Sequence, residues 1–120
     1  MSTYDYFQRA FRRDREARAG VAGSLIHGAD GNCAVFWLDT AQGMISSVHY
    51  RCTTCVTLLA FCEHLSELAI GMPIERALQY HPDQLLALHP DVPQYRTDRA
   101  KLASEAFRSA VIHIMQGELT

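Results

Sequence analysis

Two cysteines at the spacing Cys-x-x-Cys, Cys52 and Cys55, are the residues of this sequence best suited to chemistry. Thiols at this spacing can chelate one metal ion or close a small disulfide. The hydrophobic pattern changes at Cys55 from a period of two to a helical period, which predicts a strand that ends and a helix that begins there. Backbone N–H groups at a helix N-terminus stabilise a thiolate, the form that binds metal or attacks sulfur. We therefore expect Cys55 to be the more reactive member of the pair.

The other two cysteines fit apolar elements. Cys62 lies on the apolar stripe of the helix that follows Cys55, and Cys33 begins an apolar strand. Because free cysteine is among the residue types most often buried, a core position explains both, and either can still serve as an additional ligand. His81 and His89 flank a short predicted helix, and we interpret them as surface or interface residues.

The elements that position these residues follow from the hydrophobic periodicity, which indicates a helix, then three strands, then several helices. This order predicts an α+β fold, with a three-stranded antiparallel sheet and helices packed on one face. Thr53 or Thr54 is expected to cap the helix at Cys55. The N-terminal helix is expected over residues 3–19. The sheet region is expected over residues 24–52, with strands at 24–27, 33–39 and 44–51. The helical part is expected over residues 55–116.

The composition limits the class of protein. The 120 residues fit one domain, 1–120, with 48% hydrophobic and 20% charged residues. A formal net charge of -2 provides no field that attracts nucleic acid. No apolar run approaches the roughly 18 residues that span a bilayer, and the first residues lack the apolar stretch of a secretory signal. We therefore expect a cytoplasmic protein with reduced thiols that binds neither nucleic acid nor membrane.

The stretch from Gly43 to Cys55 resembles the third-strand region of the NifU/IscU-type iron–sulfur cluster scaffolds, which leads into a Gly-Cys pair at a helix N-terminus. The resemblance continues through Gly71–Ala77, similar to Gly-x-x-Leu-x-Glu-Ala, and Leu102–Ala106, similar to Leu-Ala-x-x-Ala. It implies a SufE/NifU-like fold and the assembly of a transient iron–sulfur cluster. It also implies two kinds of partner, a cysteine desulfurase that supplies sulfur and acceptor proteins that receive the cluster.

The same resemblance maps a site that departs from the family pattern of three cysteines with an aspartate or histidine. Cys55 stands at the second cysteine, and Asp30 keeps the aspartate of a Cys-Gly-Asp turn that here begins with Gly28. Asp98 and Arg99 stand where a histidine and the third cysteine are found. The implied metal ligands are Cys55, Cys52 and Asp30, with Cys33, Asp98 and Cys62 as additional candidates.

Arg99 is an unusual residue at a ligand position. A fixed positive charge repels a metal cation but suits an anionic thiolate or persulfide, so we expect Arg99 to stabilise a persulfide. The segment 92–97 also lacks the Leu-Pro-Pro-Val-Lys motif by which chaperones recognise the family, so chaperone binding is not expected.

Three hypotheses follow, and none makes the chain an enzyme by itself. The first is a scaffold-like protein that binds iron, a transient iron–sulfur cluster or zinc through a remodelled cysteine site. The second is a persulfide acceptor or thiol redox protein that uses Cys55 and Cys52. The third is the scaffold fold without cofactor, acting as an interaction subunit through a surface that includes Trp37 and Tyr50.

Overall fold

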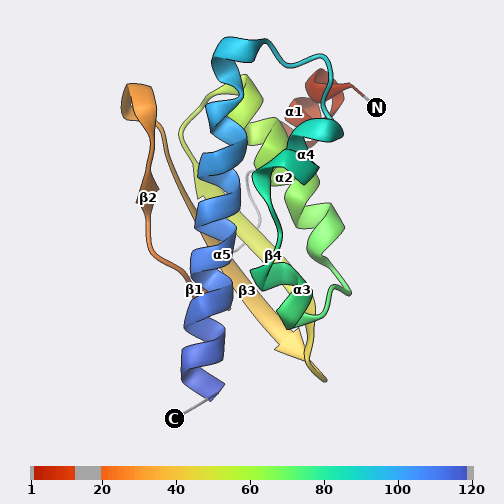
Figure 1. Cartoon of the computed structure of the whole chain (residues 1–120), viewed down its shortest axis with the longest axis vertical. Helices are drawn as coiled ribbons and strands as arrows, with labels where there is room; N and C mark the ends of the chain where they lie inside the picture. Colours follow the sequence, from red (N-terminus) through yellow and green to blue (C-terminus); the bar gives the residue numbers. More distant parts are fainter. Residues whose placement is uncertain (1, 13–19, 119–120) are drawn as a thin grey trace.

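The computed structural model describes residues 2–12 and 20–118 and has the α+β architecture expected from the sequence (Figure 1). The first helix, α1, spans Thr3–Arg12, and the rest of the predicted 3–19 helix lies outside the described residues. Ser2 precedes α1 and accepts a hydrogen bond from the backbone N–H of Asp5 through its hydroxyl, at 3.2 Å. This contact satisfies one of the free donors at the start of the helix.

A long hairpin forms the centre of the sheet. Strand β3 spans Cys33–Ala41 and pairs antiparallel with β4, Met44–Cys52. The two residues between them, Gln42 and Gly43, have φ angles of 56° and 77°, as a tight two-residue turn requires. Every second residue of β3 is buried from position 34 to 38, which is the alternation that predicted this strand.

The first strand, predicted at 24–27, is shortened to residues 26–27, and an additional short strand precedes it. The short strands β1, Val21–Ala22, and β2, Ile26–His27, both pair with β3 along the edge that β4 leaves open. Between them, the Ser24 N–H donates to Ser109 Oγ at 2.8 Å, and a side chain on Gly23 would lie 2.5 Å from the backbone of Ala110. Close contact with the last helix therefore interrupts the ladder, and the expected three-stranded sheet is a four-stranded one in the described residues.

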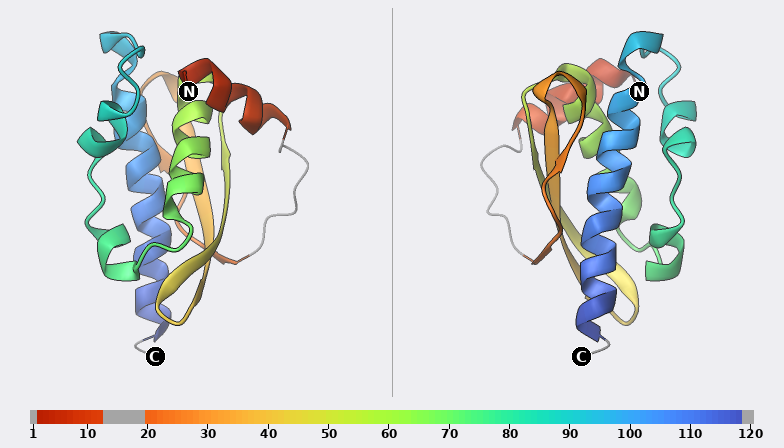
Figure 2. Two further views of the ribbon diagram at one scale, coloured as in Figure 1. Left: turned by 90° about the vertical axis from the view of Figure 1, so that its right-hand side faces the viewer. Right: turned by 60° about the vertical axis from the view of Figure 1, so that its left-hand side comes forward.

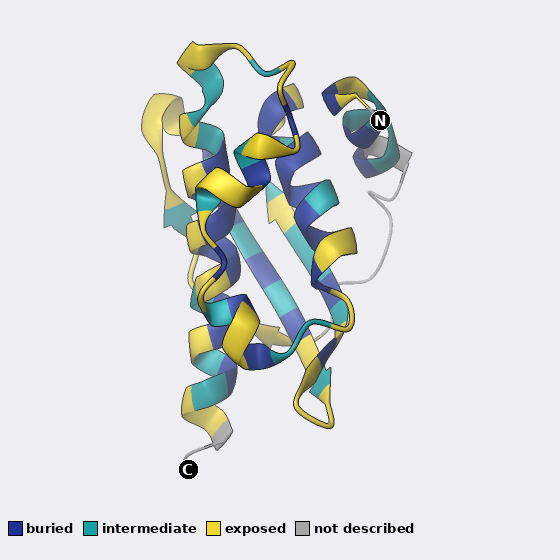
Figure 3. Ribbon diagram, turned by 45° about the vertical axis from the view of Figure 1, so that its right-hand side comes forward, coloured by how far each residue is buried: buried dark blue, intermediate teal, exposed yellow. Residues whose placement is uncertain are grey.

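Helices α2, Val56–Ala69, and α5, Asp98–Glu118, lie side by side over one face of the sheet (Figure 2). Their buried sides meet the buried side of β3, as the dark residues in Figure 3 show. Phe107 of α5 packs edge-on against Phe36 of β3, with ring centroids 5.8 Å apart. The expectation that helices cover one sheet face is confirmed for these two helices.

Short elements connect α2 to α5, and they include a histidine that the sequence placed wrongly. Helix α3, Ile74–Leu78, is followed by α4, Pro82–Ala87, which His81 caps by accepting the Asp83 N–H at 3.1 Å. His89, expected at the surface, is only 2% exposed because α1 and α2 pack over it. No helix in the described ranges is long and apolar enough to cross a membrane.

Candidate functional site

Cys55 is the N-cap residue of α2. Its backbone carbonyl accepts the Leu59 N–H at 2.8 Å, the first hydrogen bond of the helix, and its N–H donates to the carbonyl of Thr53, also at 2.8 Å. The prediction that Thr53 or Thr54 caps the helix is therefore wrong. The side chain of Cys55 makes no capping bond, so its sulfur remains available at the positive end of the helix dipole.

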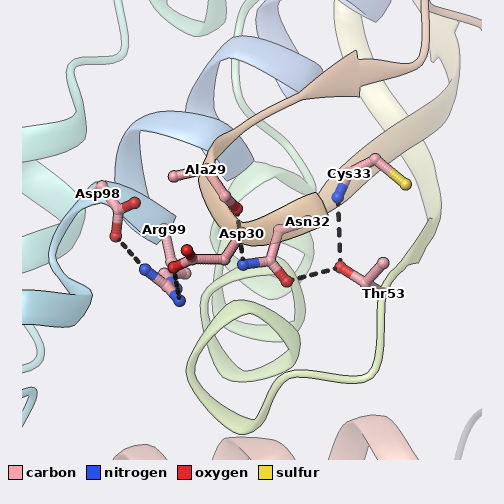
Figure 4. Close-up of polar contacts among 7 residues, drawn as sticks. All are labelled: Ala29, Asp30, Asn32, Cys33, Thr53, Asp98 and Arg99. Carbon is pink, nitrogen blue, oxygen red and sulfur yellow. Dashed lines mark hydrogen bonds and ion pairs between the residues drawn. The ribbon is translucent and has the colours of Figure 1, made fainter.

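Arg99, in the first turn of α5, is held by two aspartates (Figure 4). Cys55 lies close enough to this guanidinium to affect its pKa. One guanidinium nitrogen, Nη1, donates to Asp98 Oδ1 at 2.6 Å, and Nη2 donates to Asp30 Oδ2 at 3.3 Å. The hydrogen bond with Asp98 raises the pKa of Arg99 above its ordinary value, against the effect of burial, and Cys55 acts in the same direction. The site thus holds a permanent positive charge next to a thiol.

The remaining donor of this guanidinium is unsatisfied. The Arg99 Nε atom is buried and has no hydrogen-bond partner among the described residues. Its side chain is only 12% exposed, so water reaches little of it. Because a buried N–H without an acceptor is costly, this donor is a candidate contact for a ligand or a water molecule.

The turn that carries Asp30 is fixed to the Cys52–Cys55 loop by Asn32 and Thr53. Thr53 Oγ1 donates to Asn32 Oδ1 at 3.0 Å and accepts the Cys33 N–H at 3.2 Å, while Asn32 Nδ2 donates to the Ala29 carbonyl at 3.1 Å (Figure 4). No sequence pattern predicts this connection, because the two residues lie 21 positions apart and both are of types common in turns and helix caps. Together they place Asp30 within reach of Arg99.

Asp30 has an unusual backbone. Its φ angle of 61° lies in the left-handed region, which aspartate tolerates better than most residues. The Asp30 side chain is 74% exposed, and its carboxylate faces Arg99. Asp30 and Asp98 therefore both contact Arg99, which lies beside Cys55.

Cys52 and Cys62 form a separate pair behind Cys55. Cys52 ends β4 opposite the buried Ala34, so strand alternation directs its side chain toward α2. Cys62, in α2, is fully buried and lies near Cys52. Burial, and then the contact with Cys52, raise the pKa of the Cys62 thiol well above its ordinary value.

Tyr50 is partly buried and lies on the same face of β4 as Cys52. Its hydroxyl donates to the buried carboxylate of Glu63 at 2.8 Å, and its ring lies 5.7 Å from that of Phe36. Burial raises the pKa of Tyr50 above its ordinary value, and the neighbouring Glu63 raises it further. The tyrosine therefore fixes α2 against β4.

Cys33 is not part of either group. It precedes Ala34 in β3, whose side chain faces the core, so Cys33 projects from the opposite face of the sheet. Figure 4 shows its sulfur directed away from Arg99 and Asp30. Cys33 is thus remote from the other candidate ligands.

The donor set does not fit a resident metal ion as it is arranged. Within residues 2–12 and 20–118, no group of three or more His, Cys, Asp and Glu side chains could hold one. The Asp30 carboxylate is paired with the guanidinium of Arg99, so the position of a cation is already taken by a fixed charge. The geometry favours an anion at Cys55.

Comparison with known proteins gives a likeness in structure alone. No family model and no curated protein matches the sequence. A hypothetical protein solved at 2.3 Å matches with a TM-score of 0.63, 17% identity and coverage of 92% of this chain and 98% of the other. The N-terminal part of a nitrogen-fixing NifU-like protein from Brucella abortus matches with a TM-score of 0.56, also 17% identity, and coverage of 99% of both chains. The chain therefore has a NifU-like fold.

Proposed function

We propose that this chain takes part in iron–sulfur cluster assembly as a sulfur acceptor that carries a persulfide on Cys55. The observation that carries the proposal is the buried, unpartnered Nε–H of Arg99 on a guanidinium that faces Cys55. The terminal sulfur of a persulfide is anionic and accepts hydrogen bonds, so it suits this donor. The NifU-like fold supports the same biological setting.

The reaction is a transfer of sulfane sulfur between two thiols. The Cys55 thiolate attacks the terminal sulfur of a persulfide on a cysteine desulfurase, the donor S–S bond breaks, and a new S–S bond forms on Cys55. The proton of the Cys55 thiol passes to the donor thiolate, so the exchange needs no oxidant or reductant. The chain acts here as a carrier and not as an enzyme.

The aspartates give Arg99 its role in this exchange. Asp98 and Asp30 fix the planar guanidinium from two sides, at 2.6 and 3.3 Å, so its charge does not have to be ordered when sulfur arrives. A lysine would be a point charge without this fork of donors. Preorganised charge at the site of a developing anion accelerates the step that forms it.

A second candidate is a scaffold in the stricter sense, which receives iron or a nascent cluster as cargo. Cys52 and Cys55, at the Cys-x-x-Cys spacing that can chelate a metal ion, lie at the N-terminus of α2, and this placement is the observation that favours it. Arg99 would have to leave Asp30 before a cation could enter.

Sulfur loading of the full chain tests the first candidate. The protein is incubated with a purified cysteine desulfurase and L-cysteine, alkylated, digested and analysed by mass spectrometry. We expect one added sulfur on the Cys55 peptide in the native chain and in the control Cys33→Ser, and none at any cysteine in Cys55→Ser. Arg99→Ala should load roughly 10- to 100-fold more slowly, since it loses one charge-assisted contact.

Absence of added sulfur on Cys55 would overturn the proposal, and so would equal loading of Arg99→Ala and the native chain. Anaerobic incubation with ferrous iron and sulfide, followed by gel filtration, separates the second candidate. Iron that co-elutes with the native chain and gives visible charge-transfer absorption would favour the scaffold over the sulfur acceptor.

A further inference from the structure

Thr53 contacts both the turn that carries Asp30 and the backbone of Cys55. Its hydroxyl donates to Asn32 Oδ1 at 3.0 Å (Figure 4), and its carbonyl accepts the Cys55 N–H at 2.8 Å. One residue therefore joins the candidate nucleophile to the turn on the other side of the Arg99 guanidinium. Neither Thr53 nor Asn32 has a role in the sulfur exchange described above.

The hydrogen bonds of this connection run in one direction. Thr53 Oγ1 accepts the Cys33 N–H at 3.2 Å, so its own proton points to the amide oxygen of Asn32. The amide nitrogen of Asn32 donates to the Ala29 carbonyl at 3.1 Å. Rotation of this amide by half a turn would place two oxygen acceptors against each other, so the contacts select one orientation. Asn32 is only 9% exposed, which limits the access of water to these bonds.

Asp30 needs support from its turn, because its own contact with Arg99 is weak. Its side chain is 74% exposed and its Oδ2 atom lies 3.3 Å from Arg99 Nη2, whereas Asp98 contacts Nη1 at 2.6 Å. Exposed ion pairs contribute little to stability, since water competes for both charges. The φ angle of 61° at Asp30 also lies in a region that residues other than glycine adopt mainly where their surroundings hold them.

Asn32 holds this turn closed. Its carbonyl accepts the Gly28 N–H at 2.8 Å, and its N–H donates to the Ala29 carbonyl at 3.1 Å, the same carbonyl that accepts its side chain. These bonds enclose Asp30, and the bond to Thr53 links the closed turn to the loop before α2. The place of the Asp30 carboxylate relative to that loop therefore depends on two side chains.

We propose that Asn32 and Thr53 are positioning residues for sulfur transfer, which hold the Asp30 carboxylate on Arg99 at a fixed place relative to Cys55. This inference rests on the proposed function, because the step that they control is the persulfide loading of Cys55. The two residues act through Arg99, whose guanidinium is then already oriented when the anionic sulfur arrives.

The rate of sulfur loading tests the hydroxyl of Thr53. The full chain is incubated with a cysteine desulfurase and L-cysteine, and sulfur on Cys55 is measured with time by mass spectrometry. Thr53→Val should load about five- to tenfold more slowly than the native chain, because Asn32 Oδ1 and the Cys33 N–H each lose a partner. Thr53→Ser keeps the hydroxyl and should load within about twofold of the native rate.

Asn32→Ala is a second variant that cuts the same connection from the other side. The backbone at position 32, with φ of −71° and ψ of 145°, suits alanine. The 3.1 Å bond from the Thr53 N–H to the Cys33 carbonyl does not involve either side chain, so strand pairing is retained. Adding Thr53→Val to Asn32→Ala should slow loading by less than about twofold, because the bond between the two side chains is already absent.

A second background tests whether the pair acts through Arg99. In Arg99→Ala, adding Thr53→Val should change the loading rate by less than about twofold, since the charge to be positioned is missing. Tyr6→Phe is the matched control for stability, because it also removes one donating hydroxyl, which contacts His64 at 3.2 Å. Urea unfolding should show that both Tyr6→Phe and Thr53→Val are destabilised, but only Thr53→Val should load slowly.

Equal loading of Thr53→Val and the native chain would overturn this inference and leave the proposed function intact. The same holds if Thr53→Val slows loading by the same factor with and without Arg99. Slow loading of Tyr6→Phe would also overturn it, since a general loss of stability would then explain the effect. Failure of the native chain to load Cys55 at all would overturn both proposals.

Discussion

Two polar clusters near the ends of α2 differ in whether their hydrogen bonds are complete. The first is the Arg99 site, defined by Cys55, Asp30, Asp98 and Arg99, where one buried donor has no acceptor among the described residues. The second is the histidine network, which joins α1, α2 and the segment after α4 through the side chains of Thr3, Tyr6, His64, His89 and Asp91. Both contain side chains associated with catalysis, but only the first has hydrogen-bonding capacity to spare.

The proton positions in the histidine network follow from the carboxylate of Asp91 at one end of the network. Asp91 is an acceptor, so the Thr3 hydroxyl donates to it at 2.5 Å, and the Thr3 oxygen must accept from His89 Nδ1 at 2.9 Å. His89 Nε2 then accepts from His64 Nδ1 at 2.8 Å. His64 Nε2 in turn accepts the Tyr6 hydroxyl at 3.2 Å. Each hydrogen bond runs in one direction, and both imidazoles are neutral.

A group of reactive residue types is not a site by itself. In the histidine network every donor just named has its acceptor, so its role is to hold α1 on α2, helped by the 4.0 Å stack of Tyr6 on His64. In the Arg99 site the Nε–H has no acceptor among the described residues, and Cys55 forms no disulfide. A buried donor of this kind is a candidate contact for a ligand or a water molecule.

The largest expected effect comes from replacing Arg99, which carries the fixed positive charge, by a cysteine that can bind a metal ion. Arg99→Cys removes the cation and puts a second thiol beside Cys55, with the carboxylates of Asp30 and Asp98 released from their ion pairs. Two thiolates and a carboxylate suit Zn²⁺. We expect the variant to retain about one zinc per chain after dialysis and the native chain to retain none, measured by elemental analysis.

The matched variant Gly28→Cys restores the other cysteine that the family resemblance implies. A side chain at position 28 would approach Leu102 to 3.1 Å, so the neighbouring side chain must shift before the new thiol fits. We expect weaker zinc retention from Gly28→Cys than from Arg99→Cys. Equal zinc in Arg99→Ala and Arg99→Cys would show that the added thiol is not a ligand.

Much of the fold could be predicted because its pattern is local. Cys62 and Leu65 were expected on the buried stripe of α2, and both are fully buried. The interruption between β1 and β2 could not be predicted, because it results from the approach of Ala110 to Gly23, 87 residues away in the chain by subtraction of their positions. Periodicity reports which side of an element is buried but not what lies against it.

The candidate site was predicted through the family resemblance, which aligned Asp30, Cys55 and Arg99 although they come from separate elements. The tie between Asn32 and Thr53, and the pairing of Cys52 with Cys62, depend on tertiary contacts that no motif records. The histidine network was missed for the same reason, since Thr3 and His89 are 86 positions apart.

The histidine network should make stability depend on pH. Burial, and then the neighbouring His64, lower the pKa of His89 from 6.5 to about 4, and burial also lowers the pKa of His64. The network contributes its full stability above pH 6.5 and loses it as the pH falls toward 4, because the unfolded chain takes up the proton first. We expect urea unfolding, followed by circular dichroism, to show a loss of at most about 3 kcal/mol across this window.

The variant His89→Gln removes the titrating ring, so its free energy of unfolding should depend less on pH in this window. His81→Gln is the control, since His81 is an exposed cap residue and should leave the slope unchanged. Hydrogen bonds from Thr3 lower the pKa of Asp91, so its contribution is lost only below the ordinary range of carboxylates. An unchanged slope in His89→Gln would mean that another group causes the dependence.

The smallest expected effect isolates one bond of the network. Tyr6→Phe removes the hydroxyl that donates to His64 and keeps the ring stack, so the cost should be about 1 kcal/mol, the usual net value of one hydrogen bond. Tyr4→Phe is the control on the same helix, because Tyr4 is 58% exposed and should change stability little.

Sulfur loading of Cys55 should be unaffected by either substitution, since the two clusters share none of these side chains. A loss of sulfur loading in Tyr6→Phe would contradict the separation of the histidine network from the Arg99 site. Equal unfolding free energies for the two variants would show that the Tyr6 hydroxyl does not contribute to holding α1 in place.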